Sequence, residues 1–216
     1  SSQVGCGYGC SFCSTGAMGL SRNLTADEIL AEFILMRAIT KKVNSIVFMG
    51  MGEPLANTKN LFKAIETINS YKGFNLGIRH ITISTSGEIV GIKQLIEKDL
   101  DCRLAVSLHS LKNEVRDKIM PINKKYPIEN LISILKRYSK NGKRVITFEW
   151  VLMKDINDSV NDAYRIVNLK KEFPFKVNII PMNPVEHAPE LKKPNKDIIL
   201  RFKSILKDNG VEVIER

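Results

Sequence analysis

The stretch Gly5-Cys6-Gly7-Tyr8-Gly9-Cys10-Ser11-Phe12-Cys13 decides how this chain is organised. Its three cysteines have the spacing C-x3-C-x2-C, and the glycines between them allow the backbone to fold around one centre. The fourth cysteine, Cys102, lies far along the chain in a different context. Three neighbouring thiols therefore predict a soft metal centre held by this loop.

The number of cysteines restricts the kind of metal centre. A structural zinc ion takes a closed set of four Cys or His ligands, whereas an iron–sulfur cube with three thiolates leaves one iron open to an external ligand. Two alternatives are disulfides and a zinc ion that recruits a distant histidine, and an odd number of clustered cysteines fits disulfides poorly. The pattern favours an iron–sulfur cluster with one open iron.

At this point the sequence resembles a known family. The spacing of the cysteines, with Phe12 directly before the third one, is similar to the signature of radical S-adenosylmethionine (SAM) enzymes. The segments 1–6 (SSQVGC), 12–16 (FCSTG) and 22–24 (RNL) resemble the RNA adenine-C2 methyltransferases among them. The resemblance implies a [4Fe-4S] cluster, held by Cys6, Cys10 and Cys13, and SAM on the open iron.

The composition is that of an ordinary globular domain. The chain has 216 residues, of which 44% are hydrophobic and 26% charged, so we expect one domain over 1–216. No apolar run approaches the roughly 18 residues that span a bilayer, and no signal-like segment opens the chain. We therefore expect no membrane association and a reducing cytoplasmic setting. The net charge of +10 favours an anionic partner such as RNA, although a solvated lysine-rich surface gives the same count.

The rest of the chain alternates between helical and strand patterns. Thr25, with Glu28 three residues later, predicts a capping box for a helix that ends near Lys41-Lys42. The apolar patterns predict strands at 44–49, 80–84, 103–108, 145–153, 176–180 and 211–214. They predict further helices around 61–68, at 89–98, from 113 and from 128, at 159–172 and at 196–208.

Strands that alternate with helices over short connections predict right-handed crossovers and a parallel sheet. We expect an α/β fold, a partial (β/α)6 TIM-like barrel of the radical SAM type. An open doubly wound sheet is the alternative, because periodicity does not separate the two. The cysteine loop should follow the first strand of this sheet, and the chain looks clipped at its start because little sequence precedes the loop.

In parallel α/β folds the ligand site forms beyond the carboxyl ends of the strands. Polar or glycine-rich segments fall at those ends. They are the cysteine loop, 50–54 (GMGEP), 84–87 (STSG), 107–109 (SLH) and 181–184 (PMNP). Each segment alone also reads as a turn or a strand cap. Their agreement predicts one site.

The resemblance assigns roles to individual residues of these segments. It implies that Gly52 and Glu53 bind the amino group of SAM. It also implies that SAM contacts Phe12, Ser84, Ser107, Leu108, His109 and Asn183. We assign no acid–base role to His109.

Other residues invite a structural interpretation. We expect Cys102 and Trp150 to lie in the core, and His80 and His187 to be structural or exposed. Lys124-Lys125 form a basic loop that could touch RNA phosphates or remain solvated. Arg22 is expected to contact a phosphate or to form an ion pair that orders its loop.

The resemblance also implies a reaction. The reduced cluster cleaves SAM to methionine and a 5'-deoxyadenosyl radical, using an electron from a donor such as flavodoxin or ferredoxin. Family members use this chemistry to methylate C2 of an adenosine in ribosomal RNA and, in many cases, transfer RNA. Adenine C2 is electron-poor, so radical attack is more favourable there than ordinary methyl transfer.

The chain departs from the family pattern in one respect. The family has a methyl-carrying cysteine beyond the last strand and a second catalytic cysteine before the cluster loop, and both would lie outside Ser1–Arg216. An N-terminal RNA-binding portion is likewise not expected here. We therefore expect these 216 residues to bind a cluster and SAM without methylating RNA. The alternatives are a C8-adenosine methyltransferase core, another radical SAM enzyme acting on a small molecule, and a zinc-stabilised RNA-binding module without catalysis.

Overall fold

The computed structural model of the chain describes residues 1–40, 42–139 and 144–215. Its main sheet has six strands in the order β3-β4-β5-β6-β7-β8, and every neighbouring pair is parallel. The strands are β3 (Ile46–Phe48), β4 (Ile81–Thr85), β5 (Arg103–Ser107), β6 (Ile146–Leu152), β7 (Phe175–Pro181) and β8 (Glu212–Glu215).

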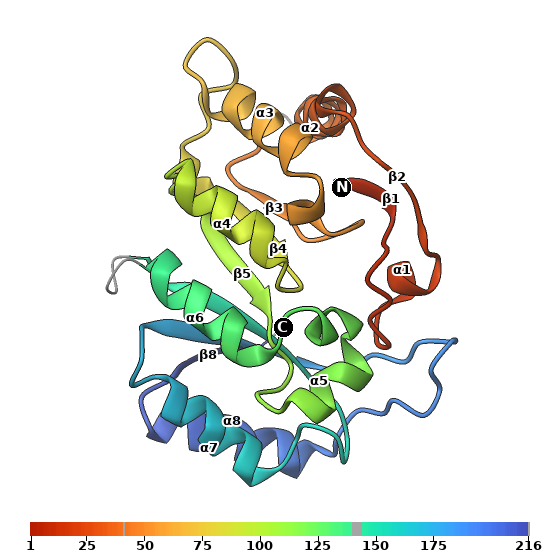
Figure 1. Cartoon of the computed structure of the whole chain (residues 1–216), viewed down its shortest axis with the longest axis vertical. Helices are drawn as coiled ribbons and strands as arrows, with labels where there is room; N and C mark the ends of the chain where they lie inside the picture. The colour runs from red at the N-terminus through yellow and green to blue at the C-terminus, as the bar shows by residue number, and fades with distance from the viewer. Residues whose placement is uncertain (41, 140–143, 216) are drawn as a thin grey trace.

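This strand order confirms the partial (β/α)6 barrel. Strands follow one another across the sheet as they do along the chain, so successive right-handed crossovers place their helices on the same face. A doubly wound sheet would instead reverse its order at a switch point. Figure 1 shows α3, α4, α6 and α7 following one another along the outside of the sheet.

The helices lie close to their predicted positions. The longer ones are α2 (Ala26–Thr40), α3 (Thr58–Asn69), α4 (Ile89–Glu97), α6 (Ile128–Ser139), α7 (Val160–Leu169) and α8 (Lys196–Asp208). Shorter turns are α1 (Ser14–Ala17), α5 (Asn113–Ile119), η1 (Pro54–Ala56), η2 (Ile78–His80) and η3 (Pro121–Lys124). Lys41, which was part of the expected end of the first long helix, lies outside the described residues.

One prediction about the sheet was wrong. The strand that precedes the cysteine loop, β1 (Gln3–Gly5), does not join the parallel sheet but pairs antiparallel with β2 (Leu20–Asn23). The chain turns back on itself because the Cys6 N–H donates to the Gly19 carbonyl at 2.8 Å and the Leu24 N–H donates to the Ser2 carbonyl at 3.1 Å. The sixth parallel strand is β8 at the other end of the chain.

The strands alternate between an apolar and a polar face. On β6, Ile146, Phe148 and Trp150 are fully buried in the apolar core, while Thr147 and Glu149 point to the other side. The same alternation separates Leu104 and Val106 from Ala105 and Ser107 on β5. The helices therefore cover the apolar face, and the polar face is left for the interior of the barrel. Cys102 and Trp150 belong to the core as predicted.

The capping box of α2 is confirmed. The Thr25 hydroxyl accepts from the Glu28 N–H at 3.2 Å, and the Glu28 carboxylate accepts from the Thr25 N–H at 2.8 Å. Both guanidinium Nη atoms of Arg22 also bind that carboxylate, at 2.8 and 2.9 Å, which gives Arg22 the role of a loop-ordering ion pair. The Arg22 bonds and the Thr25 N–H lower the pKa of Glu28 to about 2.

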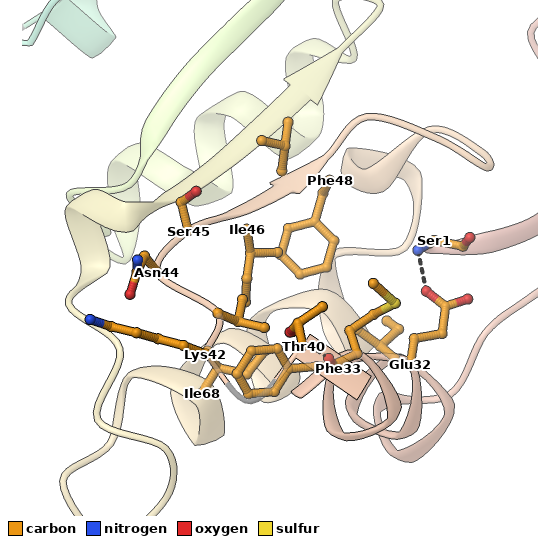
Figure 2. Close-up of a pocket in the computed structure, with 14 residues that line it drawn as sticks. Ser1, Glu32, Phe33, Thr40, Lys42, Asn44, Ser45, Ile46, Phe48 and Ile68 are labelled. Carbon is orange, nitrogen blue, oxygen red and sulfur yellow. Dashed lines mark hydrogen bonds and ion pairs between the residues drawn. The ribbon is translucent and has the colours of Figure 1, made fainter. Parts of the chain in front are cut away.

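A cavity of about 410 Å³ lies beside the edge strand β3 and under α2. At one end of it the Ser1 amino group forms an ion pair with the Glu32 carboxylate. Figure 2 shows the residues of its wall, which include the apolar side chains of Phe33, Ile46, Phe48 and Ile68. It contains none of the predicted site residues, so it is not the candidate site. Within the described residues, no helix has both the length and the apolar character needed to cross a membrane.

Removing the cap of α2 tests this part of the fold. We expect Thr25→Ala to lower the free energy of unfolding by about 1 kcal/mol, because the first turn loses a hydrogen-bond acceptor. Urea denaturation of the metal-free protein measures it. Thr67→Ala is the matched control, since the Thr67 hydroxyl only donates to the Lys63 carbonyl on an exposed helix face. Equal unfolding free energies for Thr25→Ala and the wild type would contradict the capping role.

Candidate functional site at the cysteine loop

Cys6, Cys10 and Cys13 line one cavity of about 180 Å³. All three thiols are free and partly buried. Burial is the main reason that the pKa of Cys6 is raised and that of Cys10 is raised to about 12, and the neighbouring cysteines add to both shifts. The thiolate forms of Cys6 and Cys10 are therefore unfavourable until a cationic centre compensates them, as expected for a metal-binding loop.

Three thiols are a donor set that fits an iron–sulfur cluster. Within the described part of the chain, no three His, Cys, Asp or Glu side chains are arranged to hold a single metal ion. A cubane distributes three thiolates over three different iron atoms, so its ligands surround a body and need not meet at one point. The cavity that the three thiols line is consistent with such an arrangement.

Backbone contacts fix the GMGEP loop next to the cysteine loop. The N–H groups of Ser2 and Gln3 donate to the Met51 carbonyl, and the Gln3 side-chain oxygen accepts from the Glu53 N–H at 2.7 Å. Gly52 has φ +93°, and a Cβ on it would lie 2.4 Å from the Cβ of Gln3. Only glycine fits this position, because both the backbone conformation and the space exclude a side chain.

Glu53 joins two of the predicted site loops. Its carboxylate is buried and accepts from the Leu55 N–H at 3.0 Å and from both the N–H and the hydroxyl of Ser86 at 2.7 Å. Burial raises the pKa of Glu53, and these hydrogen bonds oppose that shift. The Thr85 side chain also hydrogen-bonds to this carboxylate and lowers its pKa, so Glu53 is held on several sides while it lines the cavity.

Five of the predicted SAM contacts lie together around the thiols. Ser84 and Ser107 lie at the carboxyl ends of β4 and β5 and line the cavity together with the glycine-rich loop. The cavity is smaller than the 300–1,000 Å³ of common small-molecule sites, so a nucleoside would have to extend beyond it along the strand ends. The residues that the structure brings together with the cysteines are Phe12, Gly52, Glu53, Ser84 and Ser107.

Leu108 and His109 are buried behind this cavity and do not line it. The Nδ1 atom of His109 accepts from the Val151 N–H at 2.9 Å, which places the ring proton on Nε2. Burial lowers the pKa of His109 to about 3, so the ring stays neutral. Its ring meets that of Phe12 edge to face, with centroids 4.6 Å apart. His109 is thus suited to orient Phe12.

Asn183 does not line the cavity. The chain leaves β7 at Pro181, and the Met182 N–H donates to the Leu152 carbonyl at 3.1 Å while its side chain is buried in a second apolar cluster. The next residue, Asn183, is exposed. A contact between Asn183 and SAM stays a prediction. His187 is exposed as expected, with its Nε2 atom 3.0 Å from the Ser11 carbonyl.

Sequence reasoning missed two charged residues beside the site. The buried Glu88 carboxylate accepts from the hydroxyls of Tyr8, in the cysteine loop, and Tyr126, at the end of the basic loop. Arg116 is 1% exposed and donates to carbonyls of the STSG and SLH turns. Neither residue has a local sequence signal, because one follows a turn and the other sits in a short polar helix.

Comparison with known proteins shows the family of this chain. Residues 1–167 match the family described as the Radical SAM superfamily. Two curated relatives are named probable dual-specificity RNA methyltransferase RlmN. The one from Akkermansia muciniphila is 46% identical over 100% of this chain and 60% of its own length. The one from Dictyoglomus turgidum is 47% identical over 99% of this chain and 62% of its own length. The chain belongs to the radical SAM superfamily.

Solved structures agree with the sequence comparison. A radical SAM methyltransferase from Sphaerobacter thermophilus is 39% identical with a TM-score of 0.93, covering 100% of this chain and 64% of that one. Streptococcus suis SuiB bound to S-adenosylmethionine is 15% identical with a TM-score of 0.74, covering 99% of this chain and 48% of that one. At this identity the likeness supports the fold alone.

Two conclusions follow from these relatives. The resemblance that the cysteine motif indicated is confirmed, and enzymes of this superfamily use a [4Fe-4S] cluster and SAM. The chain spans about 60% of the length of the curated relatives that it matches.

Replacing Gly52 tests the packing of the GMGEP loop. We expect Gly52→Ala to cost about 2–4 kcal/mol of unfolding free energy, because the added Cβ meets Gln3 in a strained backbone conformation. Urea denaturation of the metal-free protein measures the loss. Gly7→Ala is the control within the cysteine loop, since its Cβ would meet only the Leu20 side chain at an ordinary distance. A Gly52→Ala protein as stable as Gly7→Ala would refute the packing argument.

Proposed function

We propose that this chain is the radical SAM core domain, residues 1–216, of an enzyme that methylates C2 of adenosine in RNA. The observation that carries the proposal is one cavity at the carboxyl ends of parallel strands. It is lined by three free thiols together with Phe12, Gly52, Glu53, Ser84 and Ser107. Relatives 43–47% identical to the chain and named RNA methyltransferases support the reaction and the substrate class.

The residues present fit the two cofactors of the superfamily. Cys6, Cys10 and Cys13 would hold the [4Fe-4S] cluster and leave one iron for the amino and carboxylate groups of SAM. The negative charge of Glu53 at the cavity wall suits an ammonium group, with Gly52 allowing close approach. The hydroxyl groups of Ser84 and Ser107 suit the carboxylate or ribose of SAM, and the ring of Phe12 and the residues of the neighbouring turns would complete the site. We assign these contacts to Phe12, Ser84, Ser107 and Asn183, and we propose that the buried Leu108 and His109 complete the SAM site from behind this cavity.

When bound, the cluster supplies the electron that cleaves SAM to methionine and a 5'-deoxyadenosyl radical. The chain itself would orient the cofactor. The partial burial of the thiols and the aromatic ring of Phe12 would limit the access of water to it. Adenine C2 is a poor nucleophile, so a radical route suits methylation at this carbon. This chemical requirement connects the cysteine loop to the proposed substrate.

RNA is the proposed macromolecular partner, both ribosomal RNA and transfer RNA. The net charge of +10 favours binding to a polyanion. Lys124 and Lys125 are exposed on a loop that Tyr126 and Glu88 connect to the cysteine loop, so a phosphate bound there would lie near the site. We further propose a cytoplasmic setting and an electron donor such as flavodoxin or ferredoxin.

Anaerobic reconstitution tests the proposed cluster. We expect the wild-type chain to take up iron and sulfide in equal amounts, turn brown, and release 5'-deoxyadenosine when dithionite and SAM are added. Ala substitutions of Cys6, Cys10 or Cys13 should abolish both signals. Cys102→Ala is the control, because Cys102 is buried in the core away from the loop. A colourless protein with stoichiometric zinc would support the zinc-stabilised module and refute the enzyme.

A second experiment separates cofactor chemistry from RNA methylation. We expect the 216-residue chain to cleave SAM without forming C2-methyladenosine, and a full-length relative, of which the chain spans about 60%, to form it in an RNA substrate. Mass spectrometry of digested RNA measures the product. Formation of C2-methyladenosine by the 216-residue chain would show that the residues outside it are not required.

A further inference from the structure

The side chain of Arg116 connects three loops of the candidate site. It leaves α5 and turns inward until it is 1% exposed. Nη1 donates to the carbonyls of Ser107, at 3.0 Å, and Leu108; Nη2 donates to the carbonyl of Ser86 at 3.3 Å; and Nε donates to the side-chain oxygen of Asn123 at 3.0 Å. One guanidinium group thus fixes the STSG turn, the SLH turn and the basic loop relative to one another.

Arg116 is also a buried cation whose hydrogen-bond acceptors are neutral. All four acceptors that the structure describes are carbonyl or amide oxygens. Burial lowers the pKa of Arg116 to about 10, which still leaves the group charged at neutral pH. A buried ion without a paired counter-charge is costly, so its retention calls for a nearby anion.

Two places beside Arg116 could supply that anion: the adjacent carboxylate of Asp117, and the cysteine cavity, which Ser86 and Ser107 line while their carbonyls bind Arg116. Asp117 is partly exposed and already accepts from Asn123 at 2.7 Å. The cysteine loop also packs against the end of α5, the helix that carries Arg116, where the Ser11 N–H donates to the Ile119 carbonyl at 3.0 Å. Arg116 is therefore placed to compensate negative charge that arises at the cysteine loop.

We propose that Arg116 is a positioning residue that orients the SAM-facing turns and supplies the fixed positive charge that favours the reduced state of the cluster. This inference rests on the proposed function. Reduction adds one electron from an external donor, dithionite in vitro, to a centre that already carries three thiolates. A fixed cation in a site of low dielectric constant stabilises the added negative charge.

The test compares Arg116→Met and Arg116→Lys with the wild type, and Arg165→Gln serves as control because Arg165 is exposed on α7. The readouts are iron and sulfide content and the midpoint potential, from an anaerobic titration followed by electron paramagnetic resonance. For Arg116→Met we expect a reduced-to-oxidised ratio lower by about tenfold, which is about 59 mV for a one-electron couple. Arg116→Lys keeps the charge and should match the wild-type potential.

Affinity for SAM separates the charge from the hydrogen-bond geometry. Both Arg116 variants lose the fork that binds the carbonyls of Ser86 and Ser107, so both should bind SAM more weakly than Arg165→Gln. An Arg116→Met potential equal to that of the wild type, or an equal shift in Arg116→Lys, would overturn the inference.

Folding and cluster uptake provide the remaining controls. Metal-free Arg116→Met should keep its circular dichroism spectrum, because removing a buried cation offsets the lost hydrogen bonds. Its unfolding would assign Arg116 a purely structural role and overturn the inference. A wild-type chain that takes up no cluster would refute the proposed function. If the wild-type chain cleaves SAM but Arg116→Met has the wild-type midpoint potential, the proposed function stands and only this inference is refuted.

Discussion

The alternation of apolar and polar residues along the parallel strands is the constraint on which the rest of the structure depends. Phe148 and Trp150 on β6 bury their side chains against the helices, which forces Thr147 and Glu149 to the opposite face. Because side chains alternate with period two, a slip of one residue would expose the core and bury the polar set. The register therefore fixes which groups face the interior of the barrel, and Ser107 beside Glu149 is one result.

The strand ends alone do not make a site, since loops from distant parts of the sequence must also be held in place. Side chains do this in the structure: Gln3 binds the GMGEP loop, Glu53 binds the STSG turn, and Arg116 binds the STSG and SLH turns. Each of these groups is buried, so each hydrogen bond is protected from competition with water. The polar connections thus give a short, glycine-rich cysteine loop a defined position.

Local patterns predicted most of the fold. The capping box of Thr25 and Glu28 and the helix at 196–208 depend on neighbouring residues, and both agree with the structure. The position of β1 depends on Met51 and Gly19, which no local pattern links to it. Arg116 escaped notice because a basic residue in a polar helix usually faces solvent. The exposure of Asn183 likewise follows from the burial of Met182, a tertiary contact.

The carboxylate of Glu88 makes two loops mechanically dependent on each other. Because it accepts from both Tyr8 and Tyr126, neither loop can shift without giving up a hydrogen bond to a charged group, which costs about 1.5–3 kcal/mol. Lys125 lies over the ring of Tyr126, with its Nζ 4.7 Å from the ring centroid, so a displacement of this lysine also affects the hydrogen bond between Tyr126 and Glu88. The positions of the outer basic loop and the inner thiol loop are therefore coupled, because a displacement of either one breaks a hydrogen bond to Glu88.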